Sequence, residues 1–189
     1  INWLEKLKKE KNPDWQEIYH LIILPTYKEP IEILKESYQR LTKINYPKEK
    51  MIVIFAGEER DKERAINNAK IIEEKYGNKF FKFLFTLHPK NLPNEIPGKG
   101  SNQAYAGKKA KELIDQLKIP YEKIIVSVFD CDSIIHLEYF SCLTYKFLIQ
   151  KNPHFCSYQP LATFQNNIWN APAFARVIST STTLWLLME

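Results

Sequence analysis

Cysteine is scarce in this sequence of 189 residues. The three copies, Cys131, Cys142 and Cys156, are odd in number and form no C-x-x-C pair. This pattern argues against both a disulfide framework and a zinc site built from thiolates. The four histidines also show no close metal-ligand spacing. A chain of this kind fits a reducing compartment, and we expect it in the cytoplasm.

Long apolar runs and dense basic clusters are missing as well. No stretch of about 18 apolar residues occurs, so no segment is expected to cross a bilayer. The charged start of the chain does not resemble a signal peptide. The net charge is +5, but the lysines and arginines are scattered and belong to no known motif, so we expect no nucleic-acid partner. Hydrophobic residues make up 44% of the chain and charged residues 26%. These fractions are typical of a folded globular domain.

Short apolar runs alternate with stretches whose apolar residues recur at helical spacing. The predicted strands are 20–24, 51–56, 79–87, 124–129 and, later in the chain, 155–164. The predicted helices are 31–41, 59–76, 101–117, 136–150 and 172–188. This order predicts an α/β fold with a doubly wound, mostly parallel sheet, whose nucleotide-binding half is Rossmann-like. Such sheets bind ligands beyond the carboxyl ends of their strands, so the residues that follow each strand are the candidate site residues.

Groups suited to a nucleoside follow the first two predicted strands. Pro25, Thr26, Tyr27 and Glu29 follow the first strand, and this set offers a ring to stack on a base and oxygens to bond a ribose. The alternative interpretation is a rigid turn with two prolines and a capping threonine. Glu58 follows the second strand, where a carboxylate suits a ribose or base donor. The alternative there is an acidic residue that a helix N-terminus favours.

The loop before the third helix, residues 97–103, is suited to a diphosphate. Two glycines allow close approach of the backbone, Lys99 supplies a positive charge, and Asn102 supplies hydrogen bonds near a helix N-terminus. The spacing is neither that of a P-loop nor that of the G-x-G-x-x-G fingerprint. The alternative is a flexible capped turn without a ligand.

Asp130 and Asp132 directly follow the fourth predicted strand and give the strongest signal. Two carboxylates at the end of an apolar strand repel each other unless a positive charge lies nearby. Mn²⁺ or Mg²⁺ supplies that charge, because these hard cations prefer oxygen ligands and share them with substrate phosphates. The alternative is a chance pair of capping aspartates. Cys131 stands between two acids, which should raise its pKa and argue against a nucleophilic role.

Taken together, these strand-end segments resemble the family 2 glycosyltransferases, which have the GT-A fold. The matching segments, in the family's order, are ILPTYKEP (23–30), IFAGEE (54–59), GKGSNQAY (98–105) and VFDCDS (128–133). The resemblance implies a nucleotide-sugar site made of Pro25, Thr26, Tyr27, Glu29, Glu58, Lys99, Asn102 and Asp130. It also implies a metal site at Asp130 and Asp132, in which Asp130 assists through ribose or water contacts. Whether Glu58 or Glu59 is the matching acid stays open.

The resemblance implies an enzyme that transfers a sugar from a nucleotide-diphosphate donor, expected to be UDP-linked, to an acceptor hydroxyl. Transfer would proceed by in-line displacement with inversion, and Lys99 would stabilise the donor charge. Residues 158–169 are similar to the acceptor side of processive or membrane-linked members; the alternative is a strand followed by an aromatic-rich loop. The acceptor is therefore expected to be a glycan or a lipid-linked sugar at the cytoplasmic face of a membrane. The 172–188 helix is open to interpretation as an interfacial helix, an acceptor-channel helix or ordinary core.

One departure from the family concerns the catalytic base. Members that invert carry a carboxylate base well beyond the two aspartates, whereas only Glu138 and Glu189 follow Asp132 here. We therefore expect the base to lie beyond Glu189, in a longer protein. In that interpretation residues 1–189 are one truncated domain, with an N-terminal extension (1–19), a nucleotide-sugar-binding half (20–135) and the start of an acceptor side (136–189).

Two other functions stay open. The chain could be a nucleotide-sugar-binding domain that does not catalyse transfer. It could instead be a sugar nucleotidyltransferase, but enzymes of that kind usually carry a glycine-rich, arginine-containing loop after the first strand. The sequence PTYKEP (25–30) at that position argues against it.

Overall fold

The computed structural model describes residues 1–9, 13–161, 163 and 171–188. The chain divides into two compact units, Ile1–Pro153 and His154–Glu189. All of the predicted site residues belong to the first unit, and the predicted boundary at residue 135 falls inside it.

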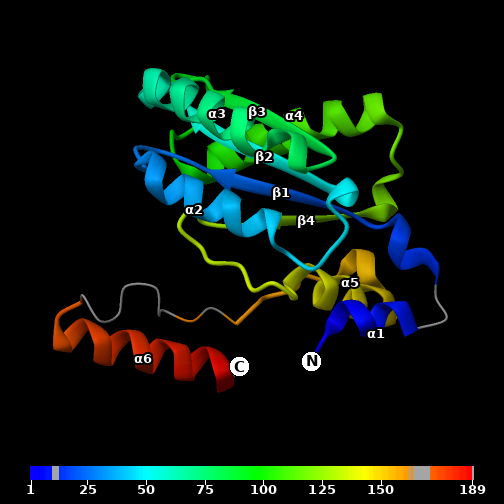
Figure 1. Ribbon diagram of the computed structural model, residues 1–189. Helices are drawn as coiled ribbons and strands as arrows, with labels where there is room; N and C mark the ends of the chain where they lie inside the picture. The colour runs from blue at the N-terminus through cyan, green and yellow to red at the C-terminus, as the bar shows by residue number, and fades with distance from the viewer. Residues whose placement is uncertain (10–12, 162, 164–170, 189) are drawn as a thin grey trace. The chain divides into compact units, whose positions relative to one another are not determined.

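The first unit is built on a four-stranded, all-parallel sheet, which confirms the predicted α/β class. Its strands are β1 (Tyr19–Pro25), β2 (Met51–Glu58), β3 (Lys82–His88) and β4 (Ile124–Val128). They lie in the order β3-β2-β1-β4, so β1 is flanked by β2 on one side and β4 on the other. Figure 1 shows the four strands running in the same direction.

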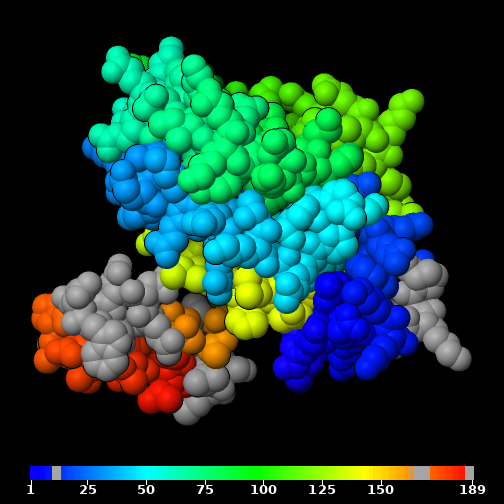
Figure 2. Space-filling model, in the orientation of Figure 1, coloured from blue at the N-terminus to red at the C-terminus, as the bar shows by residue number. Residues whose placement is uncertain are grey.

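Helices cover both faces of this sheet. The helices α2 (Ile31–Thr42) and α3 (Lys62–Tyr76) lie on one face, and α4 (Lys99–Leu117) lies on the other (Figure 1). The side chains of α2 and α3 adjoin each other in the space-filling view (Figure 2). Short 3-10 turns occupy Pro13–Glu17, Lys48–Lys50, Glu59–Asp61, Gly77–Lys79, Tyr121–Lys123 and Pro153–Phe155.

The strands alternate their side chains between two apolar layers. In β1, Ile22 and Leu24 pack in the cluster that contains Leu34 of α2. Their neighbours Leu21 and Ile23 pack in the cluster that contains Ala110 of α4. Because both faces are buried, the central strands appear in the sequence as continuous apolar runs rather than as alternating ones.

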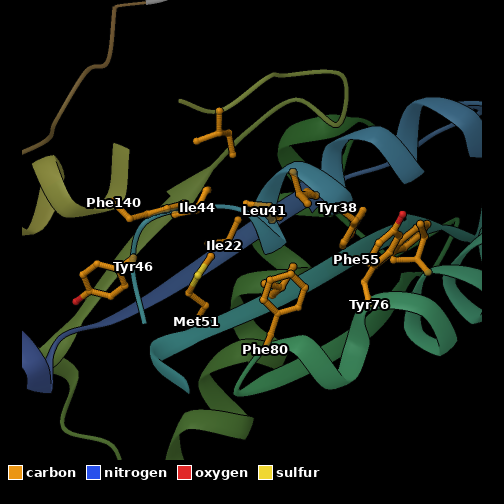
Figure 3. Packing of buried hydrophobic residues seen from close by; sticks show 14 of the residues in the cluster. Ile22, Tyr38, Leu41, Ile44, Tyr46, Met51, Phe55, Tyr76, Phe80 and Phe140 are labelled. Carbon is orange, nitrogen blue, oxygen red and sulfur yellow. The ribbon is translucent and has the colours of Figure 1, made fainter. Parts of the chain in front are cut away.

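Aromatic rings fill much of the layer under α2 and α3. Tyr38 of α2 stacks on Phe55 of β2 with the ring centroids 6.2 Å apart, and both side chains are fully buried. Figure 3 shows these rings together with Tyr76 of α3. Large rings bury much apolar area each, so this layer stabilises the position of both helices on the sheet.

The N-terminal extension folds against the end of the same unit. The helix α1 (Trp3–Lys9) packs against α5 (Tyr139–Ile149), as Figure 1 shows. The Glu138 carboxylate accepts hydrogen bonds from the backbone N–H groups of Trp3 and Leu4, at 2.8 and 3.2 Å. Partial burial opposes ionisation, but these bonds and one from the Asn45 amide lower the pKa of Glu138. Glu138 therefore caps the N-terminus of α1 as an anion.

The second unit contains the helix α6 (Ala173–Met188). The strand predicted over 155–164 is wrong for its described part, because Phe155 ends a 3-10 turn and residues 156–161 belong to no strand. An apolar run forms a strand only beside a partner, and Pro160 removes one of the N–H donors that a ladder needs. Residues 162 and 164 lie outside the described residues. No helix in the described part of the chain is both long enough and apolar enough to cross a membrane.

Candidate functional site

A cavity of about 280 Å³ opens at the carboxyl edge of the sheet, beyond β1. The connection that leaves β1 runs through α2 on one face of the sheet, whereas the connection that enters β4 runs through α4 on the other face. The direction in which the chain winds across the sheet therefore reverses beside β1. Ligands of doubly wound sheets bind at such a point. The lining residues are Pro25, Thr26, Tyr27, Glu29, Ile33, Glu58, Lys99, Asp130, Cys131 and Asp132. The cavity thus brings together every predicted site residue except Asn102.

The turn after β1 is fixed by the start of α3. The Tyr27 backbone N–H donates to the Glu29 carboxylate inside the turn. Lys28 adopts a left-handed conformation with φ 70°, which is uncommon for a residue with a side chain. Its N–H donates to Asp61 at 3.1 Å, and its carbonyl accepts from Arg64 at 2.8 Å. These bonds hold the turn in a conformation that presents Tyr27 to the cavity.

Glu58 ends β2 with its side chain almost fully buried. Arg60, two residues later, donates from Nε to Glu58 Oε2 at 2.7 Å and from Nη2 to the same oxygen. This bond raises the pKa of the Arg60 guanidinium. The carboxylate of Glu59 instead accepts from the backbone N–H of Lys90, 3.0 Å away. Of the two acids that the sequence left open, Glu58 is the one that faces the cavity.

Arg60 was not among the predicted site residues. Its guanidinium carbon lies 4.5 Å from the centre of the Tyr27 ring while its nitrogens contact Glu58. A positive charge over an aromatic face is attracted to the ring. The signal in the sequence was an arginine two residues after the acid that ends a buried strand.

Lys99 and Asp130 form an ion pair across the mouth of the cavity. Lys99 is the first residue of α4 and Asp130 follows β4, so the pair joins the two elements on either side of the site. Both side chains are about half exposed, with 52% of Lys99 and 59% of Asp130 accessible. Water screens an exposed pair of this kind, so it is readily exchanged for a ligand.

Cys131 is buried between the two aspartates. Burial, together with the charge and the hydrogen bond of Glu29, raises the pKa of the Cys131 thiol to about 12. The predicted rise is confirmed, although burial is its largest cause. The Cys131 carbonyl accepts a hydrogen bond from the Ser37 hydroxyl of α2. This contact ties the segment that carries Asp130 and Asp132 to a helix of the first layer.

The two aspartates fit a divalent cation only in part. Carboxylate oxygens are the ligands that Mg²⁺ and Mn²⁺ prefer. In the described part of the chain, however, no group of three or more His, Cys, Asp and Glu side chains could hold a metal ion. Asp130 and Asp132 therefore suit a cation that takes its other ligands from water and from the phosphates of a substrate.

Asn102 has a different environment from the other predicted residues. Its side chain is fully buried, and its Nδ2 donates to the Ala56 carbonyl at 2.7 Å. The same carbonyl accepts from the Thr26 backbone N–H at 2.8 Å. Asn102 thus holds the first turn of α4 against the end of β2 and does not line the cavity.

Comparison of the chain with protein-family models, with curated proteins and with solved structures found no match.

Proposed function

We propose that this chain binds a nucleotide-diphosphate sugar, with UDP as the expected nucleotide, and that the protein transfers the sugar to an acceptor hydroxyl with inversion. One observation carries the proposal. A single cavity at the carboxyl edge of the sheet holds groups suited to a nucleoside, Tyr27 and Glu58, and groups suited to a metal-bound diphosphate, Asp130 and Asp132.

The phosphate end of the proposed site combines three sources of positive charge. A Mn²⁺ or Mg²⁺ ion held by Asp130 and Asp132 would neutralise the charge that develops on the departing nucleoside diphosphate. Lys99 lies at the same end of the cavity and is paired with one of these carboxylates. The first turn of α4 begins at Lys99, and unpaired N–H groups of a helix N-terminus also favour phosphate. On this proposal Lys99 moves from Asp130 to a phosphate when the cation binds.

Catalysis also requires a base that accepts the proton of the acceptor hydroxyl. Among the acids that line the cavity, Glu58 binds Arg60, Asp130 binds Lys99, and Glu29 binds the Tyr27 N–H. Asp132 is assigned to the metal. None of these acids is therefore assigned as the base. This observation also favours a second candidate function, a nucleotide-sugar-binding domain that does not itself catalyse transfer.

The acceptor and the location of the protein belong to the same proposal. We propose a glycan or a lipid-linked sugar as acceptor, at the cytoplasmic face of a membrane. The support for this part comes from the resemblance of residues 158–169 to membrane-linked glycosyltransferases. Residues 162 and 164–169 of that stretch lie outside the described residues.

Calorimetry with UDP, GDP and CDP, each with and without Mn²⁺, tests the donor site. We expect binding of at least one nucleotide that depends on Mn²⁺. Asp132→Asn should remove that dependence, because an amide keeps the shape of the side chain but loses its charge. Glu74→Gln, a change of an exposed acid in the last turn of α3, is the matched control and should behave like the unchanged chain.

A folded protein that binds none of the three nucleotides would refute the donor site, and Mn²⁺ dependence that survives in Asp132→Asn would refute the metal assignment. Turnover separates the two candidate functions. Release of UDP from a UDP-sugar by this chain, lost in Asp132→Asn, would identify a complete enzyme. Binding without release would favour the non-catalytic domain.

A further inference from the structure

Arg60 contacts both of the groups that the proposed function assigns to the nucleoside. It binds Oε2 of Glu58 through Nε and Nη2, and it lies over the ring of Tyr27. Its own side chain is 33% exposed, whereas that of Glu58 is 4% exposed. Arg60 does not itself line the cavity, but it joins two residues that do, Glu58 and Tyr27.

The contact with Arg60 determines which oxygen of Glu58 can accept a hydrogen bond from a ligand. The buried Glu58 carboxylate is paired with the guanidinium of Arg60. Both hydrogen bonds from Arg60 end on Oε2, and among the described residues no hydrogen bond reaches Oε1. Oε1 is thus the oxygen that is left to accept from a ligand.

We infer that Arg60 sets the base specificity of the site by holding Glu58 and Tyr27 in the positions from which they read a base. The inference rests on the proposed nucleotide site. Because Arg60 acts through these two side chains, it is a positioning residue. Glu58, which lines the cavity, presents the acceptor that meets the base.

An acceptor held in one orientation matches a base that presents a ring N–H. Uracil offers such a donor at N3–H, and guanine offers one at N1–H. Cytosine places an acceptor nitrogen where these bases place the ring N–H, so its lone pair would face the carboxylate. A site that fixes the ribose and the diphosphate prevents the base from sliding to another register. The oriented Glu58 carboxylate therefore selects against cytosine.

Calorimetry with UDP, GDP and CDP in the presence of Mn²⁺ measures this selection. We expect UDP or GDP to bind at least about tenfold more tightly than CDP. Arg60→Ala should reduce this ratio to about threefold or less, because Glu58 loses its fixed orientation. Arg60→Lys keeps the charge without the planar fork and should give an intermediate ratio. Glu58→Gln should also reduce the ratio, because an amide can donate as well as accept.

Lys62→Ala is the matched control, since it removes one positive charge from an exposed position two residues away. It should leave the ratio unchanged. If Arg60 had only a structural role, Arg60→Ala would weaken the binding of all three nucleotides by the same factor. This result would overturn the inference. Equal affinities in the unchanged chain would overturn it too, while leaving the donor site intact. Failure of all three nucleotides to bind would instead refute the proposed function on which the inference rests.

Discussion

Lys99 and Asn102 belong to the same turn of α4 but have opposite environments. Lys99 is half exposed and lies at the cavity, whereas Asn102 is fully buried against β2. Both were predicted as ligand-binding residues because the sequence shows their chemistry and their place before a helix. A helix turns by about 100° per residue, so the face on which each side chain lies depends on how the helix packs. That packing is a tertiary property, which a loop motif does not encode.

The burial of Asn102 leads to a prediction at the scale of one residue. Asn102→Ala should lower the free energy of unfolding by about 1 to 2 kcal/mol, because a buried hydrogen bond to the Ala56 carbonyl is lost. Urea unfolding measures this change. Nucleotide affinity at a temperature where the variant is folded should change little. Gln103→Ala, a change of the less buried neighbour, is the control and should keep the stability of the unchanged chain.

A variant Asn102→Ala with full stability but no nucleotide binding would restore Asn102 to the ligand-binding set.

The other predicted residues were easier to place. Pro25, Glu58 and Asp130 each end or follow a strand, and the carboxyl ends of parallel strands meet at one edge of the sheet. Their convergence follows from the order of strands and helices alone. Arg60 escaped prediction because its contact with the Tyr27 ring depends on how another segment is placed.

At the scale of secondary-structure elements, the glycines show how tightly helices and strands approach. A Cβ added to Gly57 in β2 would lie 2.9 Å from the Ala65 Cβ of α3 and 3.3 Å from the Phe85 ring. Such distances are shorter than ordinary contacts. Gly57 therefore permits α3 to lie close to the sheet. A Cβ added to Gly107 in α4 would meet nothing within 4 Å.

These two glycines should respond to alanine in opposite ways. Gly57→Ala should lower the free energy of unfolding by about 1 to 3 kcal/mol, because the added methyl group overpacks the contact with α3. Gly107→Ala should raise it by about 0.5 to 1 kcal/mol, because alanine is favoured over glycine inside a helix. Chemical unfolding of both variants measures the difference. Equal effects of the two changes would contradict this account of the packing.

At the scale of the whole molecule, the four strands of the parallel sheet were predicted because each contains an apolar run, although only β1 and β2 are buried along nearly their whole length. The predicted strand over 155–164 failed for its described residues, since strand formation depends on an available partner as well as on composition. The docking of α1 was also not predicted. It depends on Glu138, more than 130 residues away in the sequence, and no local pattern announces such a partner.

A buried histidine makes the stability of the molecule depend on pH. His20 is fully buried beside Thr144, and burial lowers the pKa of its imidazole to about 3. An unfolded chain takes up this proton near pH 6.5, so between these values the unfolded state binds more protons than the folded state. The free energy of unfolding should therefore fall as the pH decreases below about 6.5, by at most about 1.4 kcal/mol per pH unit from this group.

Urea unfolding at pH 7, 6 and 5 measures this dependence. His20→Gln keeps a hydrogen-bonding side chain next to Thr144 but cannot take up a proton in this range. Its stability should change less than that of the unchanged chain between pH 6.5 and 5, where carboxyl groups contribute little. Parallel profiles for the two proteins would show that His20 is not the group responsible.

The place of β4 in the sheet also bears on the order in which the molecule assembles. β1 pairs with β2 after a short connection, but its other edge stays open until β4, about a hundred residues further along the chain, pairs with it. Closing so long a loop costs conformational entropy before any contact is gained. During synthesis, β1, β2 and β3 can pair on the ribosome while Asp130 and Asp132 have not yet been made. The nascent chain therefore exposes an unpaired, apolar strand edge for several seconds, at a synthesis rate of about 5 to 20 residues per second. That edge is the part of the molecule that a chaperone would have to protect.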